Sequence, residues 1–386
     1  MTAVPTAAAR PAPVLHVLHT WGVGSHTFVR STLRRTPGRA VVLCRELVRL
    51  PPPSVGREPR VVSMGPLVRR APSTVQGKAG VAVGAAVAAG GRARLVHAHF
   101  AHELPLADRI ARAQRCPLVV SLYGHDLLVE LRGGAPGLDV VRDAAAVVVL
   151  SQAFAAEVAA SGVDPARVAV IPAGIEPSEL PPRSATRRLG PTRVLFVGRL
   201  VEKKGPVDAV RAVAGAVERG ADVELTVLGS GPLRWPVKQA VATAGLGDRV
   251  TLGDGADRAT VLAAFADADI VLTPSKVAAD GDAETLLVVN VEAQGAGVPV
   301  VTTRSGGIPD GVGPDSGVLV DEGDVDGLAE AVAKLAVDPS RREVMGAAGR
   351  AWVRAERTAT RAGERTALLH QAVVAGRGVP PELRPS

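Results

Sequence analysis

Glu284 and Glu292 stand with seven residues between them in GDAETLLVVNVEAQGAGVPVV, residues 281–301, and two carboxylates at such spacing suggest either acid/base chemistry or ligand binding. If the segment is a helix from about residue 284, they lie about 12 Å apart along its axis and on one broad face. Paired carboxylates that act on one glycosidic bond stay within roughly 5 to 10 Å, so these two would instead hold opposite parts of an elongated ligand. The alternative is that valine-rich TLLVVNV is a buried strand flanked by solvated acids.

Two cations follow a predicted strand in GRLVEKKG, which begins at Gly198. Arg199 and Lys204 would stand at the carboxyl end of that strand. There they could offset the charge of a diphosphate and stabilise it as a leaving group. The alternative is an ordinary surface turn.

Glycine-bearing loops follow several other predicted strands. In GSGPLR the third position of a dinucleotide-binding fingerprint is Arg234 instead of glycine, which disfavours a nicotinamide-dependent dehydrogenase. Gly229 and Gly231 in this turn allow backbone amides to approach a ligand, although a plain strand-to-helix turn explains them equally well. Two more such loops are TWGVGSH, with Gly22 and Gly24, and RSGGIPD, with Ser305, Gly306 and Gly307.

Four histidines, His97, His99, His102 and His125, raise the question of a metal site. His97 and His99 point the same way on a predicted strand. No cysteine or acidic partner with ligand spacing accompanies them, and DGD at 280–282 lies in an acidic loop, so we predict no metal. His125, in SLYGHD after a strand, is a candidate for a role at a cleft.

The composition is that of a globular protein long enough for two domains, with 386 residues, 47% of them hydrophobic and 22% charged. An aromatic content of 2% argues against single-stranded nucleic-acid binding, which depends on aromatic stacking, so we predict no nucleic-acid partner. The two cysteines lack metal-ligand spacing and suggest a reducing compartment.

The N-terminus and the charge distribution bear on location. No run is long enough for a signal-peptide core or a membrane span, so we expect a cytoplasmic protein. The first 100 residues hold 14 lysines and arginines but only Glu46 and Glu58 as acids. This basic half suits a peripheral contact with an anionic membrane at the inner face, although a solvated arginine-rich surface would look the same.

Continuous apolar runs alternate with amphipathic helical patterns along the whole chain. VLHVL (14–18) opens the first series, and after a Pro- and Arg-rich segment at 179–191 a second series runs from RVLFVG (193–198) to GVLV (317–320). Such runs predict parallel strands covered on both faces by helices. The predicted fold is α/β, with two Rossmann-like domains joined near residue 185 and a ligand cleft between them.

Residues 193 to 355 carry motifs that resemble the retaining glycosyltransferases of family 4, which have the GT-B fold. The motifs are, in order, VLFVGRLVEKKG, VELTVLGSGP, RVTLGDG, FADADIVLTPS, the E-x7-E pair, VEAQGAGVPVVTTRSGGIPD and SGVLVDEGDVDGLAEAV. The acidic DGD-E lead-in is similar to the exopolysaccharide (colanic acid) branch. The first half resembles the family only through HTFVR, VHAHFAHELP and SLYGHD.

The resemblance implies a role for each matched residue. Glu284 contacts the transferred sugar, Glu292 holds the ribose hydroxyls, and Arg199 and Lys204 bind the diphosphate without a bound metal or cofactor. The other donor-binding residues that it implies are Gly22, Gly24, Gly198, Gly229, Gly231, Arg249 and Val250 near the base, Thr285, Leu286, Leu287, Ser305, Gly306 and Gly307. We expect His125 among the catalytic candidates, and His99, Tyr123 and Asp126 on the acceptor side.

Two departures from the family pattern bear on specificity. The family usually has E-G-x-P where this chain has Glu284 followed by Thr285, Leu286 and Leu287. A β-branched residue in place of glycine restricts the backbone where amides approach the ligand. Tyr123 stands where the family often has histidine. Donor preference and activity therefore stay open.

We predict a metal-independent retaining glycosyltransferase that uses a UDP- or GDP-sugar and a hydroxyl acceptor in exopolysaccharide, glycolipid or natural-product biosynthesis. The predicted domains are acceptor-binding residues 1–185, donor-binding residues 186–360, and a C-terminal helix and tail, 361–386, that packs back on the first domain. The alternatives are a non-catalytic protein that binds a nucleotide sugar or glycan, and a nucleotide-sugar epimerase.

Overall fold

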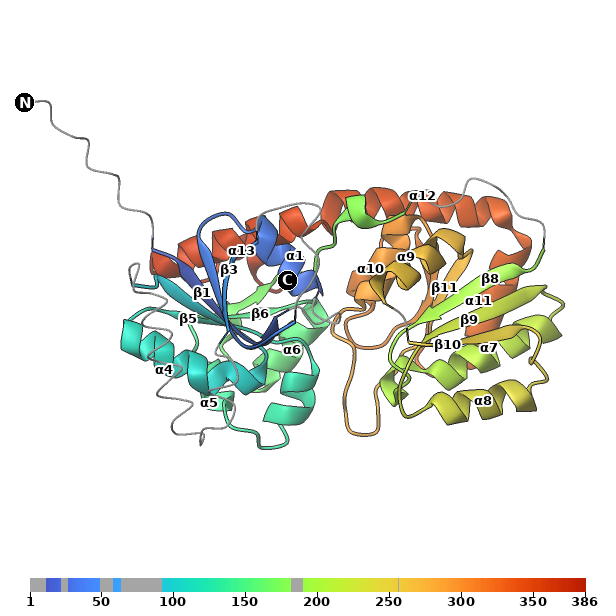
Figure 1. The fold of residues 1–386 in the computed structure, drawn as a ribbon, viewed down its shortest axis with the longest axis horizontal. Helices are drawn as coiled ribbons and strands as arrows, with labels where there is room; N and C mark the ends of the chain where they lie inside the picture. The colour runs from blue at the N-terminus through green and yellow to red at the C-terminus, as the bar shows by residue number, and fades with distance from the viewer. Residues whose placement is uncertain (1–11, 22–26, 49–57, 64–91, 182–189, 256) are drawn as a thin grey trace, which may run out of the picture.

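A computed structural model describes residues 12–21, 27–48, 58–63, 92–181, 190–255 and 257–386. Two parallel sheets organise these residues, as the alternation of apolar runs and helices predicted. Figure 1 shows them side by side, the first in blue and green and the second in yellow and orange. None of the helices in the described ranges is long and apolar enough to span a membrane.

The first sheet has the order β3-β2-β1-β4-β5-β6-β7, and every printed pairing is parallel. Its strands are β1 (Val14–Trp21), β2 (Ala40–Leu47), β3 (Arg60–Ser63), β4 (Leu95–His99), β5 (Leu118–Ser121), β6 (Ala146–Val149) and β7 (Val168–Val170). The helices beside it are α1 (Thr27–Arg35), α4 (Leu104–Gln114), α5 (Leu138–Asp143) and α6 (Gln152–Ala160). Apolar clusters lie on both faces of the sheet, which explains its continuous hydrophobic strands.

The second sheet has the order β10-β9-β8-β11-β12-β13. Its strands are β8 (Thr192–Val197), β9 (Val223–Gly229), β10 (Val250–Asp254), β11 (Ile270–Thr273), β12 (Val300–Thr303) and β13 (Gly317–Val320). The helices that cover it are α7 (Pro206–Glu218), α8 (Arg234–Thr243), α9 (Arg258–Asp267), α10 (Val288–Ala296), α11 (Val325–Val337) and α12 (Pro339–Glu356). Strand order reverses beside β8, and ligands of open parallel sheets bind at the carboxyl ends near such a point.

The last helix returns to the first sheet. α12 lies over the second sheet, and α13 (Ala359–Val374) continues from it across the first sheet, where it lies beside α1 (Figure 1). Leu369 and Val373 of α13 join Val14 and Leu95 in one buried cluster. The C-terminal segment thus ties the two sheets together.

One local prediction was half wrong. TLLVVNV is not a strand, because α10 begins at Val288 and the preceding residues form a loop. Glu292 is therefore on a helix, whereas Glu284 lies in the loop before it. The 12 Å spacing expected for a helix from residue 284 does not apply.

Candidate active site

The loop after β8 brings three cations to the carboxyl edge of the second sheet. Lys204 Nζ lies 2.9 Å from Glu284 Oε1, and Lys203 Nζ lies 3.7 Å from the same atom. Lys203, which is buried, also pairs with Asp282 at 2.9 Å. Arg199 stands exposed in the same loop. The predicted partners Lys204 and Glu284 thus meet. Lys203 and Asp282 join them, and the sequence marked Asp282 only as part of the DGD-E lead-in.

The electrostatics of this group keep Glu284 ionised. Burial favours the protonated form of its carboxyl group, but Lys204, Lys203 and Arg199 outweigh burial, so the pKa of Glu284 lies below its usual value. Asp282 and Glu284 balance two of the three cations. The group therefore keeps an excess positive charge, which suits a diphosphate.

Glu292, on α10, forms an ion pair with Arg258 at the start of α9. Burial raises the pKa of Glu292 above its usual value, and the Arg258 guanidinium offsets only part of this effect. Asp257 caps α9 by accepting a hydrogen bond from the Thr260 N–H, which fixes the turn that presents Arg258. Sequence reasoning missed Arg258, which carries no motif signal.

The prediction that Arg249 and Val250 lie near the base is wrong. Both stand at the amino end of β10, and Arg249 bonds to Asp222, just before β9, at 2.7 Å. A strand of this length spans roughly 16 Å, and the ligand edge is at its other end, where Arg234 binds the Gly253 carbonyl oxygen. Gly253 and Asp254, and not Arg249, are therefore the β10 residues nearest that edge.

Four of the predicted donor-site glycines face protein backbone at close range. A Cβ on Gly229 would lie 1.9 Å from the Gly198 oxygen, and one on Gly231 would lie 2.5 Å from the Leu200 oxygen. A Cβ on Gly306 or Gly307 would likewise meet the carbonyl oxygen of Glu284 or Thr285. These glycines let the loops around Glu284 pack together. The predicted Gly22 and Gly24 lie outside the described residues.

Other predicted donor residues are buried beside Glu284. Ser305 Oγ is buried and has no hydrogen-bond partner within the described part of the chain. Leu286 joins Leu150 and Ala173 of the first domain in an apolar cluster, so its side chain packs across the boundary between the domains. Leu287 is also buried.

The catalytic and acceptor-side candidates of the first domain divide into cleft and interior residues. His125 lies across the domain boundary from Asp282, with Nδ1 3.2 Å from Oδ2. The Asp126 carboxylate instead accepts hydrogen bonds from the backbone N–H groups of Tyr123, Gly124 and Leu127, and burial raises its pKa to about 6 despite these bonds. Its part in the described structure is to shape the loop. The placement of Asp126 on the acceptor side remains a prediction.

Tyr123 and His99 face the interior of the first domain. The Tyr123 hydroxyl lies 2.6 Å from His99 Nδ1, and His99 Nε2 lies 3.1 Å from His16 Nδ1. His97 bonds to Ser121 at 2.8 Å and to His370 of α13 at 3.0 Å. Burial holds the pKa of His16 and His97 well below the usual value and that of His370 at about 3, so these rings are neutral.

Two groups of described side chains have ring nitrogens or carboxylate oxygens close enough to hold a metal ion: His16, His97 and His99, and His19, His102 and Glu103. His16 comes from the neighbouring strand β1, and Glu103, an acidic partner that sequence reasoning did not find, comes from the turn after β4. Glu103 already pairs with Arg45 and His19. The expectation that the transfer reaction needs no metal remains a prediction.

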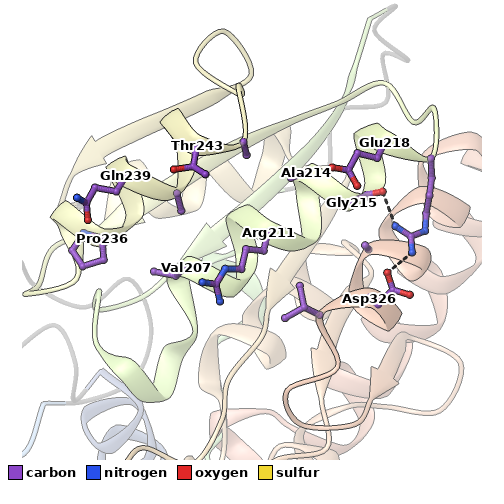
Figure 2. A pocket seen from close by; sticks show the side chains of 14 residues that line it. Val207, Arg211, Ala214, Gly215, Glu218, Pro236, Gln239, Thr243 and Asp326 are labelled. Atoms are coloured by element: carbon purple, nitrogen blue, oxygen red, sulfur yellow. Dashed lines mark hydrogen bonds and ion pairs between the residues drawn. The ribbon is translucent and has the colours of Figure 1, made fainter.

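A hollow of about 700 Å³ lies away from these residues, between α7, α8 and α11 (Figure 2). Val207, Ala214 and Gln239 contribute to its wall. Arg219, at the C-terminal end of α7, pairs with Asp326 and bonds to the Gly215 oxygen at its rim. None of the predicted site residues lines it, so its size does not mark the active site.

Comparisons with known proteins match both halves of the chain. A family model described as "Glycosyl transferase 4-like domain" matches residues 23–174, and one described as "Glycosyl transferases group 1" matches residues 181–352. The GDP-mannose-dependent alpha-(1-6)-phosphatidylinositol monomannoside mannosyltransferase of Mycobacterium tuberculosis is 33% identical over 65% of this chain and 68% of that protein. A putative colanic acid biosynthesis glycosyltransferase of Escherichia coli is 34% identical over 48% of this chain and 46% of that protein.

The fold has solved counterparts. The crystal structure of Anabaena Alr3699/HepE in complex with UDP aligns with a TM-score of 0.75 at 18% identity, over 94% of this chain and all of that chain. This likeness and the two parallel sheets confirm the predicted architecture. The chain therefore belongs to the group 1 glycosyltransferases, with a family 4-like N-terminal domain, and has the GT-B fold.

Proposed function

We propose that this glycosyltransferase moves a hexose from a UDP- or GDP-sugar to an acceptor hydroxyl with retention of configuration and without a metal. The observation that carries the proposal is the group of Arg199, Lys203 and Lys204 around the ionised Glu284, at the edge of the sheet where ligands of this fold bind. The first domain would bind the acceptor and the second the donor.

Charge stabilisation of the leaving group is the main catalytic role in this proposal. As the bond between the sugar C1 and the diphosphate oxygen breaks, negative charge grows on that oxygen, and Arg199 and Lys204 offset it. The N-terminus of α10 supports these two cations. Leu287 at its N-cap supplies no side-chain hydrogen bond to the first N–H groups of the helix, so these groups can donate to the diphosphate instead.

The acceptor oxygen would attack C1 on the face that the diphosphate leaves, and its proton would pass to the departing phosphate oxygen. This course needs no carboxylate nucleophile, and none is assigned among the described residues. Glu284 would exchange its contact with Lys204 for a hydroxyl of the transferred sugar, and Glu292 would leave Arg258 to bind the ribose hydroxyls.

The donor and pathway are proposed from the relatives. The name of the Mycobacterium tuberculosis relative specifies GDP-mannose and a phosphatidylinositol mannoside, which favours GDP-mannose and a glycolipid acceptor here. A peripheral contact of a cytoplasmic enzyme with an anionic membrane would suit such an acceptor. Arg30 and Arg34 of α1 already pair with Glu58, so any such contact depends on other basic residues, and sedimentation with anionic vesicles tests it.

Calorimetric titration with UDP, GDP, dTDP and their common sugar conjugates tests the donor site. We expect micromolar binding of one nucleotide and a loss of about tenfold or more in Glu292→Gln, because a ribose hydroxyl pair then lacks its charged acceptor. Glu330→Gln, which alters an exposed glutamate on α11, is the matched control. Binding without transfer to any acceptor would support a non-catalytic binding protein, and conversion of the donor alone would support an epimerase.

A further inference from the structure

Thr285 makes a contact between the domains that the usual glycine of the family could not make. Its hydroxyl Oγ1 donates a hydrogen bond to the backbone carbonyl oxygen of Tyr123, at 2.9 Å. Tyr123 begins the loop of residues 123–126 after β5, here called the acceptor loop, and Thr285 belongs to residues 282–287, here called the donor loop. Thr285 is 5% exposed, so water competes little for this bond.

The two loops touch closely beside this bond. A Cβ on Gly124 would lie 2.9 Å from Thr285 Cγ2 and 3.4 Å from the Ala283 carbonyl oxygen. Gly124 has φ +123°, a conformation that other residues rarely adopt. The acceptor loop is therefore built to accept the threonine at van der Waals distance.

Asp282 provides a second link from the same donor loop. Its Oδ2 lies 3.2 Å from His125 Nδ1 of the acceptor loop, and its Oδ1 lies 2.9 Å from Lys203 Nζ. The side chain of Asp282 is 12% exposed. One carboxylate thus connects the acceptor loop with the cation group that would bind the diphosphate.

The acceptor loop is held in shape for these contacts. The Asp126 carboxylate accepts hydrogen bonds from the N–H groups of Tyr123 at 3.0 Å and Gly124 at 2.8 Å. These bonds fix the backbone that places the Tyr123 carbonyl oxygen opposite Thr285. The loop therefore presents a fixed surface, and little ordering is needed when the domains close.

We infer that Thr285 and Asp282 are positioning residues that hold the acceptor loop on the donor loop, so that both halves of the active site are assembled before the nucleotide sugar binds. This inference rests on the proposed function. A donor that binds only the closed arrangement has an apparent affinity reduced by the fraction of molecules that are closed. The two links keep that fraction high in the free protein.

Two variants remove the links, and the first does so with little change in shape. Thr285→Val keeps the β-branched side chain and loses the hydroxyl donor, and His125→Ala removes the partner of Asp282. Each link contributes roughly a fivefold factor to the closing equilibrium. We expect the double variant to raise the KM for the donor about tenfold or more. Thr285→Ser, which keeps the hydroxyl group, should raise this KM less than Thr285→Val does.

Small-angle X-ray scattering without ligand tests closure independently of turnover. The double variant should have a larger radius of gyration than the wild type and should return to the wild-type value with saturating nucleotide. An unchanged radius of gyration would overturn the inference, whatever happens to kcat or KM. If no nucleotide sugar binds to the wild type, the proposed function fails, and the radius of gyration of the ligand-free variants still decides whether the links close the domains.

Discussion

Replacing Lys204 with alanine is expected to lower kcat about 100- to 1,000-fold, the usual cost of removing one preorganised group that stabilises developing charge. Lys204 Nζ is placed before the reaction starts, since its ion pair with Glu284 at 2.9 Å holds it at the carboxyl edge of the sheet. The charge on the departing diphosphate grows in the transition state, so kcat should fall more than donor affinity.

Two further variants separate the charge of Lys204 from its packing. Lys204→Arg keeps a cation and should recover part of the lost kcat. Lys238→Ala removes an exposed lysine from α8 and should leave kcat unchanged. Steady-state kinetics at saturating donor, with melting temperatures to verify folding, measure the effect. If Lys204→Ala had the same kcat as Lys238→Ala, the diphosphate would not depend on Lys204.

The architecture could be predicted because its signal is local. GVLV at 317–320 is β13 with the predicted bounds, since this short apolar run is bounded by the turn residues PDS before it and DEGD after it. α10 was harder, because its valines favour a strand locally. Hydrogen bonds of a buried side-chain amide favour the helix instead. Gln294 Nε2 donates to the carbonyl oxygen of Asn290, which lies one helical turn earlier, and to that of Gly311.

The site was predictable only where a motif fixed the place of a residue relative to the end of a strand. Lys204 and Glu284 meet because each lies in the segment between a strand and the next helix, and the two strands, β8 and β11, flank the point where the strand order reverses. The prediction for Arg249 was wrong because this residue precedes its strand and so lies at the opposite edge of the sheet. Arg258 and Asp282 depend on contacts between distant segments, and the sequence alone holds no signal for such pairs.

The first domain is expected to lose stability steeply on acidification, while the second is not. His16, His97 and His370 are buried with a pKa well below the usual 6.5, and burial is the main cause for each. As pH falls below 6.5, these histidines bind protons in the unfolded chain but stay neutral in the native state. Stability is therefore lost as pH falls, by up to about 1.4 kcal/mol per pH unit for each histidine.

The three histidines together give a loss of about 4 kcal/mol by pH 5.5, a large part of the 5 to 15 kcal/mol that stabilises a typical domain. Asp126 acts in the opposite direction. Burial raises its pKa to about 6, so its native carboxyl group takes up a proton over the same range and restores about 1 kcal/mol. The net effect still favours unfolding of the first domain.

The second domain is an internal control, because none of the eight histidines lies between residues 186 and 360. Amide hydrogen exchange at pH 7 and 5.5, corrected for intrinsic rates, should show lost protection in β1, β4 and β5 but not in β8 and β9. His370→Gln should reduce the pH dependence of stability by about a third, because one of three proton-linked groups is gone.

Equal loss of protection in both sheets, or none, would contradict the assignment of acid sensitivity to the buried histidines. A loss confined to the first sheet would show that the histidines shared by β1, β4 and α13 limit the pH range in which the two halves of the active site stay together.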